Sequence, residues 1–351
     1  MPERSSDGVR FGIVLPTRDF IVRERMEDCP RIFDMAERVE ALGYDSAWVG
    51  DSLLARPRLE ALTTLAFVAG RTRRLGIGTS VFLPPLREPV LLAYTLASLD
   101  LISGGRLTLG VGMGAKDPAS LHEYRSVGVD PDRRLSRLEE TLLLLRRLWT
   151  EQAVTHDGKH FHIENVTVLP RPAQPRGPRI LLSVGNNGDQ LSPRQLNRVL
   201  AWGDGIMPSR ALPDEYRRIW AQVMAAAGQR GRDPATLTPA LYFTIHLGDD
   251  VRAAEREADE FLLSYYPRRH WGDRWGPWGP ASTIRERIDA FIEAGVRLFV
   301  VRFAAWDAPA QLERFTDEVF ARYRSALPPH PLLAGGGEGG RSPSPPGRGP
   351  G

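Results

Sequence analysis

Hydrophobic runs and amphipathic stretches alternate along the chain from residue 10 to about residue 326. The runs are short, rich in β-branched and apolar residues, and end in a small or polar residue. The stretches between them carry apolar residues three and four positions apart, which is the spacing of a helix. The runs predict eight strands: Arg10–Leu15, Ser46–Val49, Leu75–Thr79, Arg106–Val111, Arg179–Val184, Gly203–Met207, Ala240–Leu247 and Arg297–Phe303. The stretches predict helices at Ile32–Leu42, Arg58–Ala69, Pro89–Ile102, Arg134–Trp149, Asp214–Ala227, Val251–Leu263, Thr283–Ala294 and Ala308–Ser325.

Several predicted strands are apolar throughout instead of alternating between apolar and polar residues. Residues 179–184 read Arg-Ile-Leu-Leu-Ser-Val, and residues 298–301 read Leu-Phe-Val-Val. This pattern is typical of parallel strands that helices cover on both faces. The fold class is therefore α/β. Strands that alternate with helices in this number predict a (β/α)8 barrel, a TIM barrel, and an open doubly wound sheet is the second interpretation.

Two segments and the C-terminal end depart from the alternation. Ala153–Leu169 predicts a β-hairpin inserted before the fifth strand, because Asp157-Gly158 is a strong two-residue turn signal between alternating residues. Tyr265–Gly279 predicts a long loop dense in aromatic residues and arginine. Beyond residue 328 the chain is Gly, Pro, Ser and Arg with almost nothing to bury. We expect one domain over residues 1–328 and a disordered tail over residues 329–351.

Composition and charge exclude several classes of protein. The 46 basic and 43 acidic side chains leave a net charge of +3 and are interleaved, which is unlike a nucleic-acid-binding stripe. Cys29 is the single cysteine, so an intrachain disulfide is impossible. The longest apolar stretch, Val90–Leu99, is too short to span a membrane and there is no apolar signal segment. We expect a cytoplasmic protein that binds neither nucleic acid nor membrane.

The carboxyl ends of the strands carry the candidate chemistry, because (β/α)8 barrels place their active sites there. Small and polar residues follow most strands and no set of metal ligands emerges. His156, His160 and His162 lie on the hairpin, where a solvated face is the better interpretation than a metal site. The sequence predicts a broad hydrogen-bonding site for a large cofactor. The strand-end residues are Thr17 and Arg18; Asp51 and Ser52; Thr79 and Ser80; Gly110, Gly112 and Gly114; Gly185, Asn186 and Asn187; Met207–Arg210; His246; and Arg302.

The glycines after the fourth strand allow two interpretations. Gly110-Val-Gly-Met-Gly-Ala fits the dinucleotide-binding pattern of a pyridine-nucleotide Rossmann enzyme. That motif opens a Rossmann domain, whereas here it follows the fourth strand. Glycines also let the backbone approach a flat ring system closely, and this second interpretation is the one we favour for Gly110, Gly112 and Gly114.

Taken together, the motifs resemble those of the bacterial luciferase-like family of flavin- and deazaflavin-dependent oxidoreductases. The resemblance covers roughly residues 10–325 and rests on the order and spacing of its pieces along the chain. These include Phe11-Gly-Ile-Val-Leu-Pro, Ala41-Leu-Gly-Tyr-Asp-Ser-Ala-Trp-Val-Gly-Asp, Leu75-Gly-Ile-Gly-Thr-Ser-Val, Asp100-Leu-Ile-Ser-Gly-Gly-Arg-Leu-Thr-Leu-Gly-Val-Gly-Met-Gly, Pro178-Arg-Ile-Leu-Leu-Ser-Val-Gly, Trp202-Gly-Asp-Gly and Glu293-Ala-Gly-Val.

The resemblance implies a dimeric (β/α)8 barrel whose cofactor ring lies over the strand ends. Some members use reduced FMN and oxygen as monooxygenases, with a separate reductase as the source of reduced cofactor. Others use coenzyme F420 as a hydride carrier. In many deazaflavin members a bulge with a non-proline cis peptide after the third strand backs the ring. Ser80-Val81 matches that position, and we expect a cis bond there with Thr79, Ser80 and Val81 against the cofactor.

Two departures from the family pattern affect the expected chemistry. Many members place a histidine after the aspartate of the second strand, where this chain has Ser52 after Asp51. Deazaflavin sugar dehydrogenases carry a glutamate after the fourth strand, where this chain has Ala115 and Lys116. The acid–base group is therefore sought at Asp51, at His246 or in the loop of residues 265–278. We expect an FMN monooxygenase acting on a small organic molecule, with an F420-dependent dehydrogenase or reductase and a catalytically silent flavin-binding protein as alternatives.

Further expectations concern the cofactor phosphate and the loop. We expect Gly185, Asn186 and Asn187 to offer N–H donors to a phosphate oxygen. We also expect the loop Tyr265–Gly279 to cover the cofactor, with Arg268 and Arg269 binding its anionic groups. The alternative is a fixed loop whose tryptophans pack on neighbouring helices.

Overall fold

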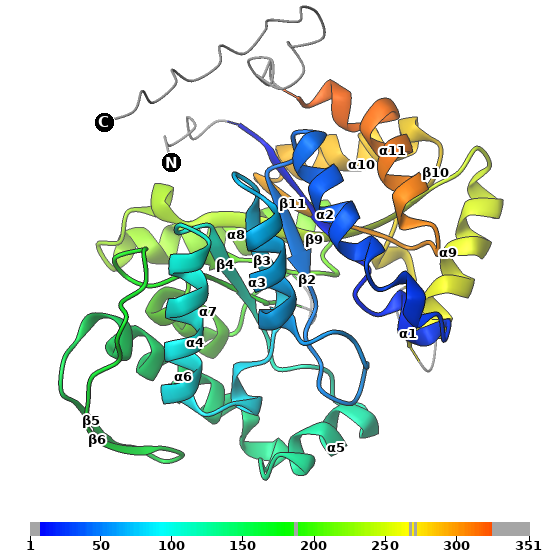
Figure 1. Cartoon of the computed structure of the whole chain (residues 1–351). Helices are drawn as coiled ribbons and strands as arrows, with labels where there is room; N and C mark the ends of the chain where they lie inside the picture. The colour runs from blue at the N-terminus through cyan, green and yellow to red at the C-terminus, as the bar shows by residue number, and fades with distance from the viewer. Residues whose placement is uncertain (1–7, 186–188, 267–268, 270–271, 325–351) are drawn as a thin grey trace, which may run out of the picture.

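Parallel strands close into a barrel in the computed structural model of the chain, and helices surround them (Figure 1). The structure describes residues 8–185, 189–266, 269 and 272–324. Around the barrel the strands are β1 (Arg10–Val14), β2 (Ser46–Val49), β3 (Gly76–Phe82), β4 (Leu107–Val111), β7 (Arg179–Leu182), β8 (Gly205–Ile206), β9 (Thr238–Leu247) and β11 (Leu298–Phe303). Pairing of β11 with β1 and of β8 with β9 closes the ring, which confirms the barrel and excludes an open sheet.

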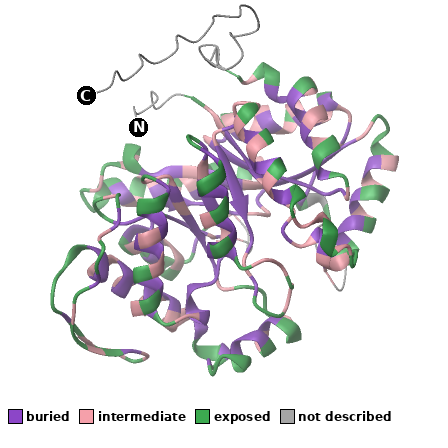
Figure 2. Cartoon of the chain, viewed as in Figure 1, coloured by how far each residue is buried: buried purple, intermediate pink, exposed green. Residues whose placement is uncertain are grey.

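The helices pack their apolar faces on the outside of the barrel, so the strands are buried and the outer helix faces are exposed (Figure 2). The outer helices are α2 (Arg31–Ala41), α3 (Ala61–Arg71), α4 (Pro89–Ile102), α6 (Arg134–Thr150), α7 (Pro193–Trp202), α8 (Pro213–Gln229), α10 (Ala281–Glu293) and α11 (Ala308–Glu318). Further helices lie in connections that leave strand ends: α1 (Asp19–Val22), α5 (Pro118–Ser126) and α9 (Val251–Tyr265). Short 3-10 turns are η1 (Met26–Asp28), η2 (Pro84–Leu86), η3 (Pro131–Arg133), η4 (Pro234–Thr236), η5 (Gly272–Arg274) and η6 (Phe320–Arg322).

Sequence patterns missed α7 and misplaced several element ends. Helix α7 begins with Ser192 as N-cap, Pro193 at its first position and Gln195 completing a capping box. The third strand continues past its predicted end to Phe82. The second predicted helix corresponds to α3, which begins at Ala61 rather than Arg58. The Glu60 side chain caps it by accepting a hydrogen bond from Thr63 N. Arg58 is thereby left in a loop.

The inserted hairpin is present and consists of β5 (Val154–Asp157) and β6 (His162–Val166). Its turn is wider than the predicted two-residue turn at Asp157-Gly158, since Asp157 itself pairs with His162. The Glu140 carboxylate on α6 organises this turn by accepting hydrogen bonds from the backbone N–H groups of His160 and Phe161 at 3.0–3.2 Å. A long-range contact therefore overrides the local turn signal.

One tryptophan fills the interior of the barrel below the strand ends. Trp48 packs with Leu181, Met207 and Val300 inside the ring. A Cβ atom on Gly12 or Gly78, on the strands beside β2, would lie 2.3 Å or 2.5 Å from the indole, so only glycine leaves it enough room. The barrel is therefore solid at this level.

Candidate active site

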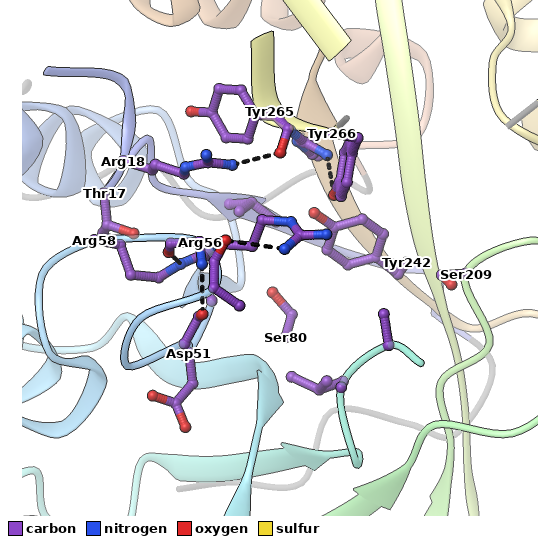
Figure 3. A pocket seen from close by; sticks show the side chains of 18 of the residues that line it. Thr17, Arg18, Asp51, Arg56, Arg58, Ser80, Ser209, Tyr242, Tyr265 and Tyr266 are labelled. Carbon is purple, nitrogen blue, oxygen red and sulfur yellow. Dashed lines mark hydrogen bonds between the residues drawn. The ribbon is translucent and has the colours of Figure 1, made fainter. Parts of the chain in front are cut away.

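A cavity of about 760 Å³ opens at the carboxyl ends of the strands (Figure 3). Connections after β1 to β4 supply one side, and β9, β11, α9 and the residues after α9 supply the other. The lining residues include 14–19, 50–52, Arg56, Arg58, Ser80, Val81, Leu83, 114–118, Glu123, Met207, Ser209, Arg210, Tyr242, Phe261, Tyr265, Tyr266, Trp275, Arg302 and Phe303. The cavity lies where the sequence places the candidate chemistry.

The end of β3 bulges against the cavity, as its register with β4 shifts between Thr79 and Phe82. The Ser80-Val81 peptide bond is cis, which confirms the prediction. Ser80 and Val81 both line the cavity, and the buried Ser80 Oγ has no hydrogen-bond partner in the described structure. Thr79 lies outside the lining, where its Oγ1 donates a hydrogen bond to the Gly110 carbonyl at 2.9 Å. Ser80 thus presents an unsatisfied polar atom to whatever occupies the cavity.

The three glycines at the end of β4 and just after it serve different purposes. A Cβ atom on Gly110 would lie 2.2 Å from the Thr79 carbonyl oxygen, and one on Gly112 would lie 2.7 Å from Val81 Cγ2. These two glycines therefore let the β3 bulge pack closely on β4. Gly114 has a positive φ of 66° and lines the cavity itself.

Asp51 borders the cavity, but its carboxylate is engaged elsewhere. Arg87 forms a bidentate ion pair with it, at 2.7 Å and 2.9 Å, and Leu83 N donates a third hydrogen bond at 3.0 Å. Its side chain is 3% exposed, and Figure 3 shows it pointing away from the other labelled side chains. The neighbouring Ser52 Oγ donates to Glu123 at 2.9 Å. The hydrogen bonds of Asp51 and Ser52 therefore fix the loops around the cavity.

His246 lies outside the cavity lining. Its Nδ1 donates a hydrogen bond to the Ala304 carbonyl at 2.9 Å, and its Nε2 lies 3.1 Å from Glu257 Oε2. The short strand β10 (Trp278–Gly279) pairs with β9 at His246, which encloses the imidazole. The structure therefore does not bring His246 together with Asp51 or with the cavity.

The predicted phosphate-binding residues are only partly described. Asn186, Asn187 and Arg268 lie outside the described residues. Gly185 follows β7 with a positive φ of 91° and lies outside the cavity lining. Arg269 is exposed and pairs with Glu255 at 3.0 Å and Asp259 at 3.3 Å on α9. Arg269 is therefore held on the outer side of α9 rather than in the cavity lining.

The described part of the loop after α9 borders the cavity and also packs on a neighbouring helix. Tyr265, Tyr266 and Trp275 line the cavity. Trp275 and Trp278 also pack in a cluster with Phe261 and Leu262 of α9. The described part of this loop thus forms a wall of the cavity and is anchored by its tryptophans on the neighbouring helix.

Titratable side chains that the sequence does not single out individually also face this cavity. Burial raises the pKa of Asp19 to about 7, although Arg302, Arg23 and Arg18 oppose the rise. Burial acts to raise the pKa of Tyr266 as well, but the Arg302 and Arg58 guanidinium groups outweigh it and lower that pKa. Burial raises the pKa of Tyr242. Asp19 directly follows the strand-end residue Arg18, and Tyr266 belongs to the aromatic loop, so both positions carry a signal in the sequence.

Residues 9–274 match the model of a family described as luciferase-like monooxygenase. The chain belongs to this family. The match covers more than half of the sequence, and the predicted resemblance to luciferase-like oxidoreductases is confirmed. Among the described residues, no helix is long and apolar enough to cross a membrane.

Proteins similar to this chain differ in the reactions that their names give. The chain is 34% identical to the F420-dependent glucose-6-phosphate dehydrogenase of Kineococcus radiotolerans, over 82% of this chain and 91% of that protein. Monooxygenase RslO1 from Streptomyces bottropensis has the same fold, with a TM-score of 0.74 at 24% identity over 90% of this chain and all of that one. An F420-dependent secondary alcohol dehydrogenase also has a TM-score of 0.74, at 19% identity over 91% of this chain and all of that one.

Proposed function

We propose that the chain is an F420-dependent oxidoreductase that transfers a hydride between the deazaflavin and a small organic substrate. The observation that carries this proposal is the 34% identity, over most of both chains, to an F420-dependent dehydrogenase. The likeness to RslO1 is at the level of the fold alone, so it does not favour the monooxygenase that the sequence led us to expect. The F420-dependent alternative is therefore the better supported of the two.

The residues around the cavity fit a flat ring system. Ser80 Oγ is buried without a partner, and Val81 and Gly114 line the cavity beside it. We assign these three residues to contact with the ring, and Thr79, Gly110 and Gly112 to shaping the bulge behind it. When bound, the deazaflavin supplies a ring carbon that accepts or donates a hydride. Phe261 and Trp275, in the aromatic wall of the cavity, exclude water from that ring.

Tyr266 is the acid–base group in this proposal. It belongs to the loop of residues 265–278, one of the places that the sequence offers for that group. It lines the cavity, and Arg302 Nη1 donates a hydrogen bond to its hydroxyl at 3.1 Å. In substrate reduction the Tyr266 hydroxyl donates a proton to the substrate oxygen, and in oxidation the phenolate accepts it. Arg302 stabilises the phenolate in both directions.

The substrate differs from that of the sugar dehydrogenases in this proposal. The resemblance places their acid–base histidine and glutamate where this chain has Ser52 and Ala115-Lys116. Ser52 is bonded to Glu123 at 2.9 Å, and that carboxylate also accepts a hydrogen bond from Leu54 N at 2.8 Å. Ser52 and Glu123 are thus committed to the loop after β2. We therefore do not assign glucose-6-phosphate oxidation to the chain.

Binding spectroscopy tests the proposed cofactor. Purified protein is titrated with F420, FMN and NADH, and binding is followed by the change in cofactor fluorescence. Saturable F420 binding that Ser80→Tyr weakens at least tenfold, with the exposed Ser282→Tyr on α10 as the matched control, is the expected result. Tighter binding of FMN, together with oxygen consumption when reduced FMN is supplied, would instead identify a monooxygenase. Binding without turnover of any alcohol, aldehyde or ketone would identify a carrier.

We further propose that the chain forms a homodimer through α3 and α4. These helices lie side by side in Figure 1. Leu91 and Ile102 on α4 are 66% and 64% exposed, and Tyr94 and Phe67 nearby are about half exposed. Exposed apolar side chains concentrated on adjacent helices are typical of a protein–protein interface. An isologous contact between two copies covers this face on both.

A further inference from the structure

Three arginines form one wall of the cavity, where the connections after β1 and β2 meet β11. Arg18 follows β1, Arg58 lies in the loop before α3, and Arg302 lies on β11. All three line the cavity, and Figure 3 shows Arg18 and Arg58 reaching into the same region from different segments. Gly50 leaves room for Arg58, because a Cβ atom there would overlap its Nη1. We refer to Arg18, Arg58 and Arg302 as the guanidinium cluster.

The hydrogen bonds of the guanidinium cluster go to neutral groups. Arg18 Nη1 donates to the Tyr265 carbonyl at 2.8 Å, Arg58 Nε to the Arg56 carbonyl at 3.1 Å, and Arg302 Nη1 to the Tyr266 hydroxyl. Among the described residues, no carboxylate forms an ion pair with any of the three. Neutral acceptors leave three positive charges without compensation.

Donors of the cluster remain unused inside the protein. Arg302 is 7% exposed, and its Nη2 is buried without a hydrogen-bond partner. Arg18 Nε is buried and unpartnered in the same way. A buried guanidinium donor without an acceptor costs free energy that a bound anion would recover.

Aromatic rings fix the guanidinium groups in position. The Arg302 guanidinium carbon lies 4.8 Å from the centre of the Tyr265 ring and 5.5 Å from that of Phe261. The Arg18 guanidinium lies 4.6 Å from the same Tyr265 ring. Such contacts hold a cation by the ring quadrupole and leave its net charge unchanged. Arg18 and Arg302 are therefore preorganised for a ligand, which reduces the entropy lost on binding.

The carboxylates that line the cavity do not neutralise the cluster. Asp51 pairs with Arg87, Asp117 pairs with Arg56 at 3.0 Å, and Glu123 bonds Ser52 and Leu54 N. Asp19 is the remaining carboxyl group among the described lining residues. Its pKa is raised to about 7 by burial, so at neutral pH it carries only part of a charge. An excess of positive charge persists at this wall.

We propose that the guanidinium cluster binds a carboxylate or phosphate group of the substrate. This proposal rests on the proposed function and specifies its substrate as an acidic molecule. The cluster stands at β11, β1 and the connection after β2, whereas the expected cofactor-phosphate residue Gly185 follows β7, on the opposite side of the ring. The anionic group of the substrate and the phosphate of the cofactor can therefore bind at different places around the strand ends. Arg302 would then place the substrate anion beside Tyr266.

Anion binding to the cofactor-free protein tests this assignment. Inorganic phosphate and acetate are titrated at constant ionic strength and followed by calorimetry. We expect saturable binding that Arg58→Met and Arg302→Met each weaken about 10- to 100-fold, as expected for the loss of hydrogen bonds to a charged group. Arg125→Met removes an exposed cation of α5 that lies outside the cavity lining and should change the affinity less than about twofold. Circular dichroism shows whether each variant is folded, and the partly exposed Arg58 provides the test if Arg302→Met unfolds.

A second titration separates the two possible sources of the anion. If the cluster serves the substrate, phosphate still binds when F420 is saturating, and Arg58→Met leaves the F420 affinity unchanged. Displacement of phosphate by F420, with weaker F420 binding in Arg58→Met, would overturn the assignment to the substrate. Equal phosphate binding by wild type, Arg58→Met and Arg302→Met would overturn the anion site itself. Phosphate binding at the cluster without any F420 binding would contradict the proposed function alone.

Discussion

The Nη1 atom of Arg302 lies 3.1 Å from the hydroxyl oxygen of Tyr266, and both side chains line the cavity at the strand ends. Burial alone would raise the pKa of this phenol, whereas Arg302 and Arg58 lower it. The pair therefore combines a hydroxyl group that can exchange a proton with a cation that stabilises the phenolate. The first two predictions follow from this contact.

Replacing Tyr266 with phenylalanine should remove the acid–base group and keep the ring. We expect kcat to fall roughly 100- to 10,000-fold, the usual contribution of a general acid or base, while F420 affinity stays within about twofold. Steady-state kinetics and fluorescence titration measure the two quantities. Tyr94→Phe, on the exposed face of α4, is the matched control and should retain full activity. Equal kcat for Tyr266→Phe and wild type would rule out this role for the hydroxyl group.

Replacing Arg302 with methionine should change the pH dependence of the reaction. In substrate reduction Tyr266 acts in its protonated form, so the rate falls as the pH rises through its pKa. Without the Arg302 guanidinium that pKa is higher, and the alkaline limb of the kcat profile should move to higher pH. A pH titration followed by the tyrosinate absorption band should show the same rise in the pKa of Tyr266. The component that belongs to Tyr266 should be absent from the titration of Tyr266→Phe. An alkaline limb at the same pH in both proteins would contradict the coupling.

The Asp19 carboxyl group should make folding stability depend on pH near neutrality. Its pKa is raised from 3.8 to about 7 in the folded protein, so the folded state binds more protons than the unfolded state between these values. Stability contributed by this group is therefore lost as the pH rises from about 4 to 7 and is constant above that. Asp19→Asn should be more stable than wild type at pH 8, by roughly 4 kcal/mol, with little difference near pH 4. Urea unfolding at several pH values measures this difference in stability, with Asp317→Asn at an exposed position as the control.

Gly110 should tolerate no side chain. A Cβ atom there would lie 2.2 Å from the Thr79 carbonyl oxygen, a backbone atom that cannot move without displacing the β3 bulge. We expect Gly110→Ala to destabilise the protein by about 1–3 kcal/mol. Gly70→Ala in α3 meets nothing within 4 Å and should stabilise the protein by about 0.5–1 kcal/mol, since alanine is the better helix former. Thermal unfolding compares the two, and equal melting temperatures would contradict the packing argument.

The exposed apolar face of α3 and α4 should hold two copies of the chain together. Leu91→Asp and Ile102→Asp place charges in that interface, and each should convert a dimer into a monomer in sedimentation velocity experiments. Leu263→Asp introduces the same charge at an apolar residue of α9 that is 49% exposed, and should leave the dimer intact. A monomeric wild-type protein would contradict the proposed interface.

Sequence patterns predicted the barrel well because its strands and helices each have a pattern that can be recognised within a short segment. Apolar runs such as Leu298-Phe-Val-Val define buried parallel strands, and the helices between them have a regular apolar spacing. The cis bond at Ser80-Val81 was predicted from the family resemblance. Element ends were less accurate where a distant side chain decides them, as Glu140 does at the hairpin turn.

The candidate site was harder to predict because it depends on which way side chains turn. Periodicity assigned Arg58 to a helix, whereas capping by Glu60 starts that helix later and leaves Arg58 in the cavity wall. Asp51 and His246 occur at strand ends as predicted, but their partners Arg87 and Glu257 come from segments far away in the sequence. Strand-end position alone could not show which polar groups remain unsatisfied. Ser80, Arg18 and Arg302 emerge as such only when all neighbours are placed.

Trp48, with the glycines that make room for it, affects the order in which ligands bind and dissociate. The indole and its neighbours plug the barrel directly beneath Val14 and Val81, which belong to the cavity floor. The reaction chamber therefore has a closed base, and every ligand must use the mouth on the loop side. A cofactor ring seated on the floor at Val81 would be trapped under a substrate held at the guanidinium cluster. We expect the last molecule to enter to be the first to leave, so turnover should follow an ordered sequence in which the substrate site empties before the cofactor is exchanged.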